Sequence, residues 1–371
     1  MPEARTRKRT TILDVANAAG TSRGVVSSVL NGNRHATTRV SPETQERIRI
    51  AAVSLGYRPN ALARSLQGRQ TKNILFASYF VSTLLNPQGG SFYVEALDGA
   101  LTAATGRNYD LMIHLVHPND PEKVAVLGDG RADGGIWMAP NVEDPVIPRL
   151  LGELDWPLVI FGGRFAGVTA NVIADNLQGM ELAVEHLYRL GHRRLAFVSQ
   201  SNLSYECVER WEAFAGVCAR YALDARRIIA TQTEPDENGR RQIIGESIMT
   251  PLLDQASRPT GIVAFNDSLA ASVMQYARQV GMVMPHDLSI IGFDSTPLCD
   301  SLTPPLTSVR QPIRAMAKRC VEILIEEFNP IELAMAQGDA PGDNVRVEMF
   351  SCCLDIREST APAPSGTFLK S

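Results

Sequence analysis

The feature that most constrains this fold is a repeated alternation of apolar runs with helix-like segments between residues 73 and 357. The apolar runs are NILFASYF, DLMIHLV, GGIWMAP, PLVIFGG, RRLAFVS, RRIIAT, GIVAFND and LSIIGFD. Near-continuous apolar strands between helices are typical of parallel sheets that helices cover on both faces. Because the pattern restarts after its first four strands, the sequence predicts an α/β body of two similar lobes.

Residues 11–57 follow a different pattern, which predicts three short helices. Thr11 with Asp14 has the spacing of a capping box, Ser22 is a good N-cap, and Ser41-Pro42 is a strong start signal. The expected apolar stripes are Ile12, Val15, Ala16 and Ala19; Val26, Val29 and Leu30; and Ile48, Ala51, Ala52 and Leu55. Two short helices joined by a tight turn and backed by a third predict an all-α helix-turn-helix head, whose second helix reads the major groove.

Charge is unevenly distributed along the 371 residues. Residues 1–72 hold 13 basic and 4 acidic residues, whereas the remainder has a net charge of −13. A basic segment of this kind favours nucleic acid as a partner, and the alternative is a solvated, weakly ordered arm. No run approaches the roughly 18 apolar residues of a membrane span, and no apolar stretch follows the charged N-terminus as in a secretory signal. The six cysteines form no CxxC pair, so we expect a protein of the reducing cytoplasm with no metal site.

The next segment, YRPNALARSLQG, predicts a basic mini-helix that carries Leu62 and Leu66 and is too short to be stable alone. Together, TILDVANAAGTSRGVVSSVLNG, VSPETQERI and LGYRPNALARSL closely resemble the head and hinge of the lactose-repressor (LacI/GalR-type) family. The resemblance continues in GHRRLAFVS, RPTGIVAFND, IIGFDSTPL and TPPLTSVRQPI, and covers roughly residues 10–357.

The resemblance implies a bacterial transcriptional regulator that binds double-stranded DNA. The candidate DNA-binding residues are Arg23, Gly24, Val25, Ser28, Asn31, Arg34, Arg64 and Leu66. Arg23 suits guanine or phosphate, whereas Gly24 has no side chain with which to read a base, which is a departure from the family. Leu66 matches the leucine that wedges into the minor groove and kinks the operator; packing against the body is its alternative role. The loop 32–39 is longer than in the family, and is either a phosphate-contacting or a solvated loop.

The resemblance also implies that the body has the fold of periplasmic sugar-binding proteins, with three crossings between lobes near residues 175, 305 and 342. The expected divisions are an arm at 1–10, a head at 11–57, a hinge at 58–72, a body at 73–357 and a disordered tail at 358–371. Within the body we expect an N-lobe of about 73–175 and 305–341 and a C-lobe of about 176–304 and 342–357. The tail has no leucine heptads, so a homodimer is expected. The resemblance implies that the dimer contacts include the helices at Phe92–Ala104 and Ser268–Gln279, which match dimer-contact helices of the family.

Ligands of open α/β sheets bind at the carboxyl ends of the strands. Asn266, Asp294 and Trp137 lie at such strand ends, and the family resemblance places Phe92, Arg210, Asn266, Asp294 and Gln311 at effector positions. With Arg164, the candidate effector-binding residues are Phe92, Trp137, Arg164, Arg210, Asn266, Asp294 and Gln311. Several have a plain structural alternative: Asn266 and Asp267 as helix caps, Arg210 as a surface ion pair, and Trp137 as core. Gly163 stands where sugar-binding members often carry Asp, and Arg164 follows it, so a simple hexose is not assured and an anion is weakly favoured.

Three other classes of protein compete with this interpretation. An enzyme is disfavoured because the sequence lacks a GxSxG elbow, P-loop, HExxH or complete GxGxxG motif, and His114 and His117 at i, i+3 of a strand point to opposite faces. A solute-binding protein would not need the basic head. A DNA-binding protein whose cleft takes no ligand remains open. We therefore expect an allosteric repressor, with no cofactor and no catalytic residue, that controls a catabolic operon, with carbohydrate use as the expected pathway, through a small-molecule effector.

Overall fold

The computed structural model describes residues 10–31, 40–57, 70–78, 91–115, 128–138, 156–200, 204–230, 258–328 and 345–364. The chain divides into two compact units, residues 1–71 and 72–371, and each is considered by itself. No helix in the described ranges is long and apolar enough to cross a membrane.

The first unit contains the three predicted helices, α1 (Ile12–Ala18), α2 (Arg23–Asn31) and α3 (Pro42–Ser54). Its capping signals act as expected. Thr11 and Asp14 form a reciprocal capping box, because the Thr11 backbone N–H donates to Asp14 Oδ2 at 2.8 Å and the Thr11 hydroxyl accepts from the Asp14 N–H. Ser41 accepts from the Thr44 N–H at the start of α3. Helices α1 and α3 therefore begin where these side chains satisfy their free N–H groups.

A small core joins the three helices. Its buried members are Val15, Ala16, Ala19, Val26, Ile48, Ala51 and Ala52. One expected member, Leu55, is exposed instead. The reason is local: α3 ends at Ser54, Leu55 is its C-cap, and Gly56 then turns the chain with φ +60°. The turn directs Tyr57 rather than Leu55 against the cluster.

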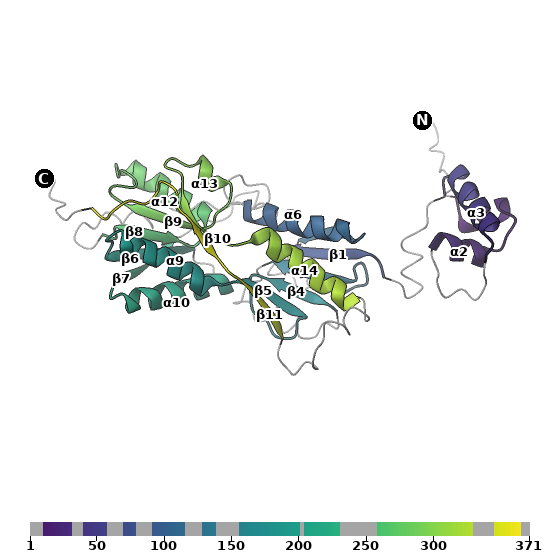
Figure 1. Cartoon of the computed structure of the whole chain (residues 1–371), viewed down its shortest axis with the longest axis horizontal. Coiled ribbons are helices and arrows are strands. Elements are labelled where there is room, and N and C mark those ends of the chain that lie inside the picture. The colour runs from purple at the N-terminus through teal and green to yellow at the C-terminus, as the bar shows by residue number, and fades with distance from the viewer. Residues whose placement is uncertain are drawn as a thin grey trace, which may run out of the picture. The chain divides into compact units, whose positions relative to one another are not determined.

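The second unit contains two six-stranded sheets, as the alternating pattern predicts (Figure 1). The first sheet has the order β11-β5-β4-β3-β1-β2. Its strands are β1 (Asn73–Ser78), β2 (Asp110–Leu115), β3 (Gly134–Met138), β4 (Leu158–Phe161), β5 (Ala170–Ala174) and β11 (Arg346–Phe350). Every pairing in it is parallel. Strands β3, β4 and β5 are buried along their whole length, as expected for strands covered on both faces.

The second sheet has the order β12-β10-β9-β8-β6-β7. Its strands are β6 (Arg194–Gln200), β7 (Asp224–Ala230), β8 (Gly261–Ala264), β9 (Ser289–Asp294), β10 (Thr307–Arg310) and β12 (Cys353–Asp355). All pairings are parallel except that of β10 with β12. The covering helices of the unit are α6 (Ser91–Gly106), α9 (Asn176–Arg189), α10 (Tyr205–Arg220), α12 (Asp267–Gln279), α13 (Leu298–Ser301) and α14 (Ile313–Phe328). Helix α14 packs on α6 and on the first sheet, whereas α9 packs on α10.

The chain crosses between the lobes three times, and two of the crossings fall later than the sequence predicts. The first crossing follows β5. The second follows Arg310 rather than residue 305, because β10 pairs with β9 in the second sheet. The third follows Phe350 rather than residue 342, because β11 pairs with β5 in the first sheet. Short strands at a crossing, such as TSVR and RVEMF, fit either sheet, and only strand pairing decides which one they join.

The prediction of a disordered tail from residue 358 is wrong for residues 358–364. Ser359 is completely buried, and its hydroxyl accepts from the Thr307 N–H at 2.9 Å and donates to the Ile290 carbonyl. The backbone continues the attachment, since the Ile290 N–H donates to Ser359 and the Ala363 N–H donates to Leu190. Because its side chains are small, this segment approaches the second sheet closely enough for backbone hydrogen bonds. Its composition, rich in Pro and Ser, does not reveal this long-range contact. Residues 365–371 lie outside the described residues.

Candidate functional site

The first turn of α2 carries the predicted base-reading residues of the head. Arg23 and Gly24 are exposed, and Ser22 caps the helix through the Val25 N–H. Val25 is half-buried and packs against the head core, so little of its side chain is available to a groove. Ser28 is half-buried. Among the described residues at the start of α2, Arg23 is therefore the exposed long polar side chain that could contact DNA.

The other predicted DNA contacts are not placed by the structure. Asn31 ends α2, and its side chain is not among the described groups. Arg34, Arg64 and Leu66, together with the loop 32–39, the arm 1–9 and the mini-helix, lie outside the described residues.

In the second unit, three predicted effector residues meet at the carboxyl ends of the second sheet. Asp294 ends β9, Gln311 follows β10, and Arg210 projects from α10. Gln311 Nε2 donates to Asp294 Oδ1 at 2.6 Å, and an Arg210 guanidinium nitrogen lies 4.0 Å from the same oxygen. All three side chains are at least nine-tenths buried. These polar side chains, which the sequence selects at strand ends and at a crossing, thus lie together at one edge of the second sheet.

Arg210 is held on all sides. Its Nε donates to Asn176 Oδ1 at 2.9 Å, another guanidinium nitrogen donates to the Phe265 carbonyl at 2.7 Å, and the guanidinium lies 3.6 Å from the Phe293 ring centroid. Burying a charge without such partners is costly, so these contacts fix the guanidinium rather than leave it mobile. The alternative of an exposed surface ion pair is excluded for Arg210.

Sequence reasoning missed Asn176, Glu206 and Glu209. Asn176 begins α9 directly after the first crossing and bridges the two helices, accepting from Arg210 and donating to Glu209 Oε2. Asn176 could have been found from its position directly after the first crossing. Gln311 was selected because it lies at the second crossing, and the same criterion applies to Asn176. No comparable signal marks Glu206 and Glu209, which lie within a helix that carries several other charges.

Glu206 is a buried carboxyl at the boundary of the lobes. Burial raises its pKa to about 7, which Arg210 opposes and Glu209 reinforces. Across the boundary, Tyr93 of α6 has its pKa raised by burial and then by the charges of Glu206 and Asp294. Desolvation raises the pKa of Asp294 as well, against the favourable charge of Arg210. Burial therefore drives two carboxyl groups at the boundary of the lobes, those of Glu206 and Asp294, toward the neutral form.

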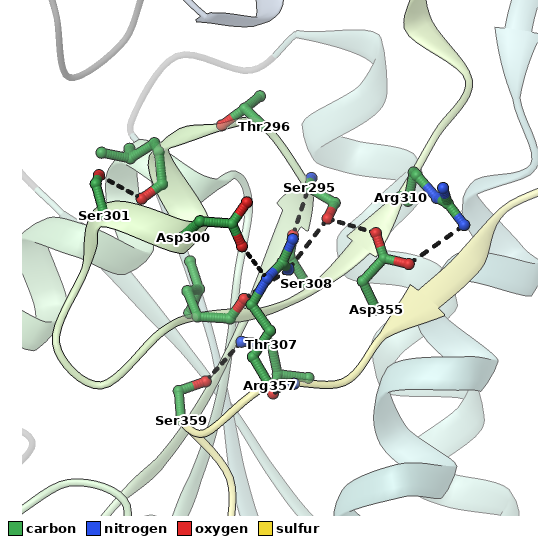
Figure 2. Close-up of polar contacts among 12 residues, drawn as sticks. Ser295, Thr296, Asp300, Ser301, Thr307, Ser308, Arg310, Asp355, Arg357 and Ser359 are labelled. Carbon is green, nitrogen blue, oxygen red and sulfur yellow. Dashed lines mark hydrogen bonds and ion pairs between the residues drawn. The ribbon is translucent and has the colours of Figure 1, made fainter.

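The turn after β9 has an unusual backbone. Asp294 and Ser295 have φ of +107° and +52°, a region that L residues occupy only when the surroundings hold them there. Figure 2 shows these surroundings: Ser308 accepts from the Ser295 N–H, the Ser295 hydroxyl donates to Asp355 at 2.7 Å, and Arg357 donates to the Ser295 hydroxyl. This network fixes the direction in which Asp294 leaves the strand.

The cap alternative for residues 266 and 267 is confirmed in part. Asn266 Oδ1 accepts from the Leu269 N–H and caps α12, so this acceptor is used within the protein. Asp267 is buried, and accepts from Thr296 and from the Ser308 hydroxyl below the turn. Asp267 therefore supports the turn after β9.

The three remaining predicted effector residues differ in their surroundings. Phe92 is half-buried and lies edge-on to Phe161, at 5.8 Å between ring centroids. Trp137 is completely buried in an apolar cluster of the first sheet, which favours the core role that the sequence left open. Arg164 extends from the loop after β4 to within 3.8 Å of Glu209. Its charge is therefore already opposed by a carboxylate, which removes the basis for favouring an anion.

Comparison with known proteins agrees with both units. A model of bacterial regulatory proteins of the lacI family matches residues 11–60, and a model of periplasmic binding protein-like domains matches residues 184–360. The HTH-type transcriptional repressor PurR of Vibrio atlanticus is 30% identical over 322 residues, covering 86% of this chain and 92% of its own. The PurR of Vibrio vulnificus is 29% identical over 330 residues, covering 87% and 93%.

Solved structures share the fold. The lac repressor dimer bound to operator and the anti-inducer ONPF superposes with a TM-score of 0.75 at 22% identity, covering 95% of this chain and all of that chain. The transcriptional regulator CelR in complex with cellobiose gives 0.62 at 24% identity, with the same coverage.

A capped helix-turn-helix head joined to a two-lobed body, with polar residues at the strand ends, defines a class of DNA-binding transcriptional regulators that carry a periplasmic-binding-protein-like domain. Within this class, the chain belongs to the LacI family of bacterial regulatory proteins.

Proposed function

We propose that this regulator is a repressor of a catabolic operon, with carbohydrate use as the favoured pathway, and that a small polar effector bound between the lobes controls it. It acts in the bacterial cytoplasm on nucleoid DNA, as a homodimer on a pseudo-palindromic operator. A two-fold dimer would place two copies of α2 in successive half-sites of such a sequence.

The observation that carries the effector proposal is the buried Arg210–Asp294–Gln311 cluster. Gln311 is almost completely buried, and its Oε1 has no hydrogen-bond partner among the described residues. A buried acceptor without a donor is costly, so a ligand that supplies an O–H or N–H group there would gain binding free energy. Charged and polar groups at the ends of parallel strands are the usual setting of such a ligand.

The charges around the cluster favour a neutral, donor-rich effector over an anion. Glu206, Glu209 and Asp294 supply carboxyl groups, Arg210 is already surrounded by partners, and Arg164 faces Glu209. Carboxylates and amide oxygens accept hydrogen bonds from hydroxyls. The related structures with cellobiose, ribose and D-xylulofuranose agree with this chemistry, although those ligands belong to those proteins.

On the DNA side, Arg23 is proposed to contact guanine or phosphate at the N-terminus of α2, with Gly24 allowing close approach. Ser28 and Asn31 are proposed as weaker contacts, and Arg34 and Arg64 as phosphate contacts. Leu66 retains its proposed role as a minor-groove wedge.

Control would follow from linkage. If the effector prefers one angle between the lobes and DNA prefers one spacing of the two heads, each ligand changes the affinity of the protein for the other by the same factor. Two alternatives remain: a cytoplasmic solute-binding protein, and a DNA-binding protein that responds to no effector.

The test is selection of genomic DNA fragments by the purified full-length protein at near-physiological salt, followed by remeasurement of binding with a panel of neutral sugars and their phosphorylated forms. Enrichment of a short pseudo-palindrome whose binding a neutral sugar changes would support the proposal. The absence of DNA binding would favour the solute-binding alternative, and specific binding that no compound alters would favour the effector-independent one.

Replacing Arg23 with Ala should weaken binding to the selected operator by about 1–3 kcal/mol, because one charged contact to a base or phosphate is lost. The measurement is a binding titration with the operator. Arg107→Ala is the matched control, since this exposed arginine of the second unit has the same charge and lies outside the head. Equal affinities for the two variants would contradict the role of Arg23.

A further inference from the structure

The loop between β4 and β5 is a braced projection of the first lobe. Asn171 is buried in β5, and its side chain accepts from the Phe165 N–H at 2.9 Å and donates to the Phe165 carbonyl at 3.0 Å. A pair of hydrogen bonds to one residue fixes both the position and the direction of the backbone there. Arg164, the preceding residue, is thereby presented from a fixed support.

The partner of Arg164 lies on the second lobe. Glu209 of α10 has its Oε1 3.8 Å from Arg164 Nε, and the same oxygen accepts from the Tyr205 hydroxyl at 2.9 Å. Glu209 Oε2 accepts from Asn176 at the first crossing. Burial and the Glu209 carboxylate raise the pKa of Tyr205 to about 12, which keeps this hydroxyl a donor. Glu209 is therefore oriented by its own lobe toward the loop of the other lobe.

A second contact beside this ion pair brings the same loop against the same helix. Gly162 has φ +74°, and a Cβ at that position would collide with the Glu206 carboxylate of α10. Only glycine meets both requirements, the left-handed backbone and the close approach. The loop after β4 thus lies directly against the first turns of α10.

From these contacts we propose that the Arg164–Glu209 pair is an interlobe latch that favours the lobe arrangement seen in this structure. Glu209 contacts the first crossing through Asn176, whereas Arg164 belongs to the loop between β4 and β5, which is not a crossing. The pair therefore adds a contact between the lobes that resists a change of angle that the crossings alone would permit. Its effect on operator affinity rests on the proposed function, because there the lobe angle sets the DNA-binding state. The latch itself requires neither DNA nor effector.

The pair is partly exposed, with 40% of the Arg164 and 29% of the Glu209 side chain accessible. Partly exposed ion pairs of this kind contribute modestly and are weakened by salt, so we expect a roughly two- to fivefold effect on the equilibrium between lobe arrangements.

The experiment is a double-mutant cycle in the full-length protein without DNA or sugar, using Arg164→Gln, Glu209→Gln and the combined variant. The readout is hydrogen exchange of two crossing amides: the Asp175 N–H, which donates to Phe350, and the Cys352 N–H, which donates to Gln178. Because Asp175 adjoins Asn176, the partner of Glu209, the Cys352 amide is the deciding readout for Glu209→Gln, and both amides count for Arg164→Gln. Small-angle X-ray scattering of the same samples reports the overall opening of the body.

The matched control is the Arg189–Glu185 pair, which lies within α9 and so within one lobe. Its geometry is similar, with a 2.9 Å contact and a glutamate that also accepts from a tyrosine hydroxyl, that of Tyr221. Arg189→Gln and Glu185→Gln should leave exchange at the crossings unchanged.

Each latch variant should speed exchange of the two crossing amides by two- to fivefold, the combined variant should add nothing further, and Arg164→Lys should retain most of the protection. The latch is overturned if Arg164→Gln leaves these amides unchanged, if the two effects multiply independently, or if the control variants produce the same change. Because the measurement contains no DNA or effector, failure of the operator selection would leave its result intact.

Discussion

At the scale of single residues, Glu206 is the clearest product of tertiary placement. Its carboxyl group is buried against Gly162 and close to Arg210 and Glu209 of its own helix, with the Tyr93 hydroxyl and Asp294 completing its electrostatic surroundings. Water is largely excluded, so the neutral form is favoured although a guanidinium stands nearby. In the sequence, Glu206 is simply a glutamate of a helix with another glutamate, Glu209, three positions later. That pattern does not indicate that Glu206 is buried.

This burial predicts a pH dependence with a definite sign. The pKa of Glu206 is about 7 in the folded protein and near 4.5 in the unfolded chain, so unfolding releases a proton between these values. Its contribution to the free energy of unfolding is complete below about pH 4.5 and is lost as the pH rises through 7. Relative to Glu206→Gln, the wild-type protein should therefore lose stability between pH 5 and 8, by roughly 3 kcal/mol at most.

The measurement is denaturant unfolding of both proteins across this pH range. Glu212→Gln is the control, because Glu212 lies exposed on the same helix. Buried Asp267, whose pKa burial also raises, titrates in all three proteins and cancels in the comparison. The Glu206 charge helps to raise the pKa of Asp294, so part of the pH-dependent difference between wild type and Glu206→Gln passes through Asp294. A constant difference between wild type and Glu206→Gln would contradict the burial of this carboxyl.

At the scale of elements, local signals and long-range pairing differ in how well the sequence reveals them. The starts of α1 and α3 follow from Thr11, Ser41 and Pro42, whose effects extend over one helical turn. Attachment of residues 358–364 depends instead on partners such as His192, whose ring contacts both Thr260 and the Ala361 carbonyl. Such partners lie too far away in sequence to form a local motif.

Ending the chain after Arg357 should lower the thermal midpoint of unfolding by roughly 5 °C or more. The truncation leaves the buried Thr307 N–H and the Ile290 backbone without the partners that Ser359 provides, at about 1–3 kcal/mol for each unsatisfied group. Scanning calorimetry measures the midpoint. Ending the chain after Pro364 is the control, since it preserves every one of these contacts, and equal midpoints for the two truncations would contradict the attachment.

At the scale of the whole molecule, the exposed apolar side chains of α6 bear on assembly. Val94 and Leu101 lie seven residues apart on one face of the helix, and each is 48% exposed in the single chain. A large apolar side chain repeated on one face is a common mark of a contact surface. This face belongs to the helix that the family resemblance places in the dimer.

Leu101→Arg should therefore convert the full-length protein from a dimer, at twice the chain mass of 40.4 kDa, toward a monomer, because a charge would be buried in the contact. Light scattering coupled to size-exclusion chromatography measures the mass. Ile229→Arg on β7, at a similarly exposed apolar position, is the control and should remain dimeric. A dimeric Leu101→Arg protein would remove α6 from the interface.

The sequence by itself determined the three-helix head, the two largely parallel sheets and the convergence of Arg210, Asp294 and Gln311. The head and the sheets follow from periodicity and capping chemistry, and Asp294 from the rule that parallel strands present their carboxyl ends at one edge. Arg210 and Gln311 follow from the family resemblance. Only the tertiary structure decided the later crossings, the attached segment 358–364, the buried state of Glu206 and the pairing of Arg164 with Glu209. Each of these features depends on which distant part of the chain a short segment contacts. Packing and strand pairing over the whole body determine that contact, and the local sequence pattern carries no information about it.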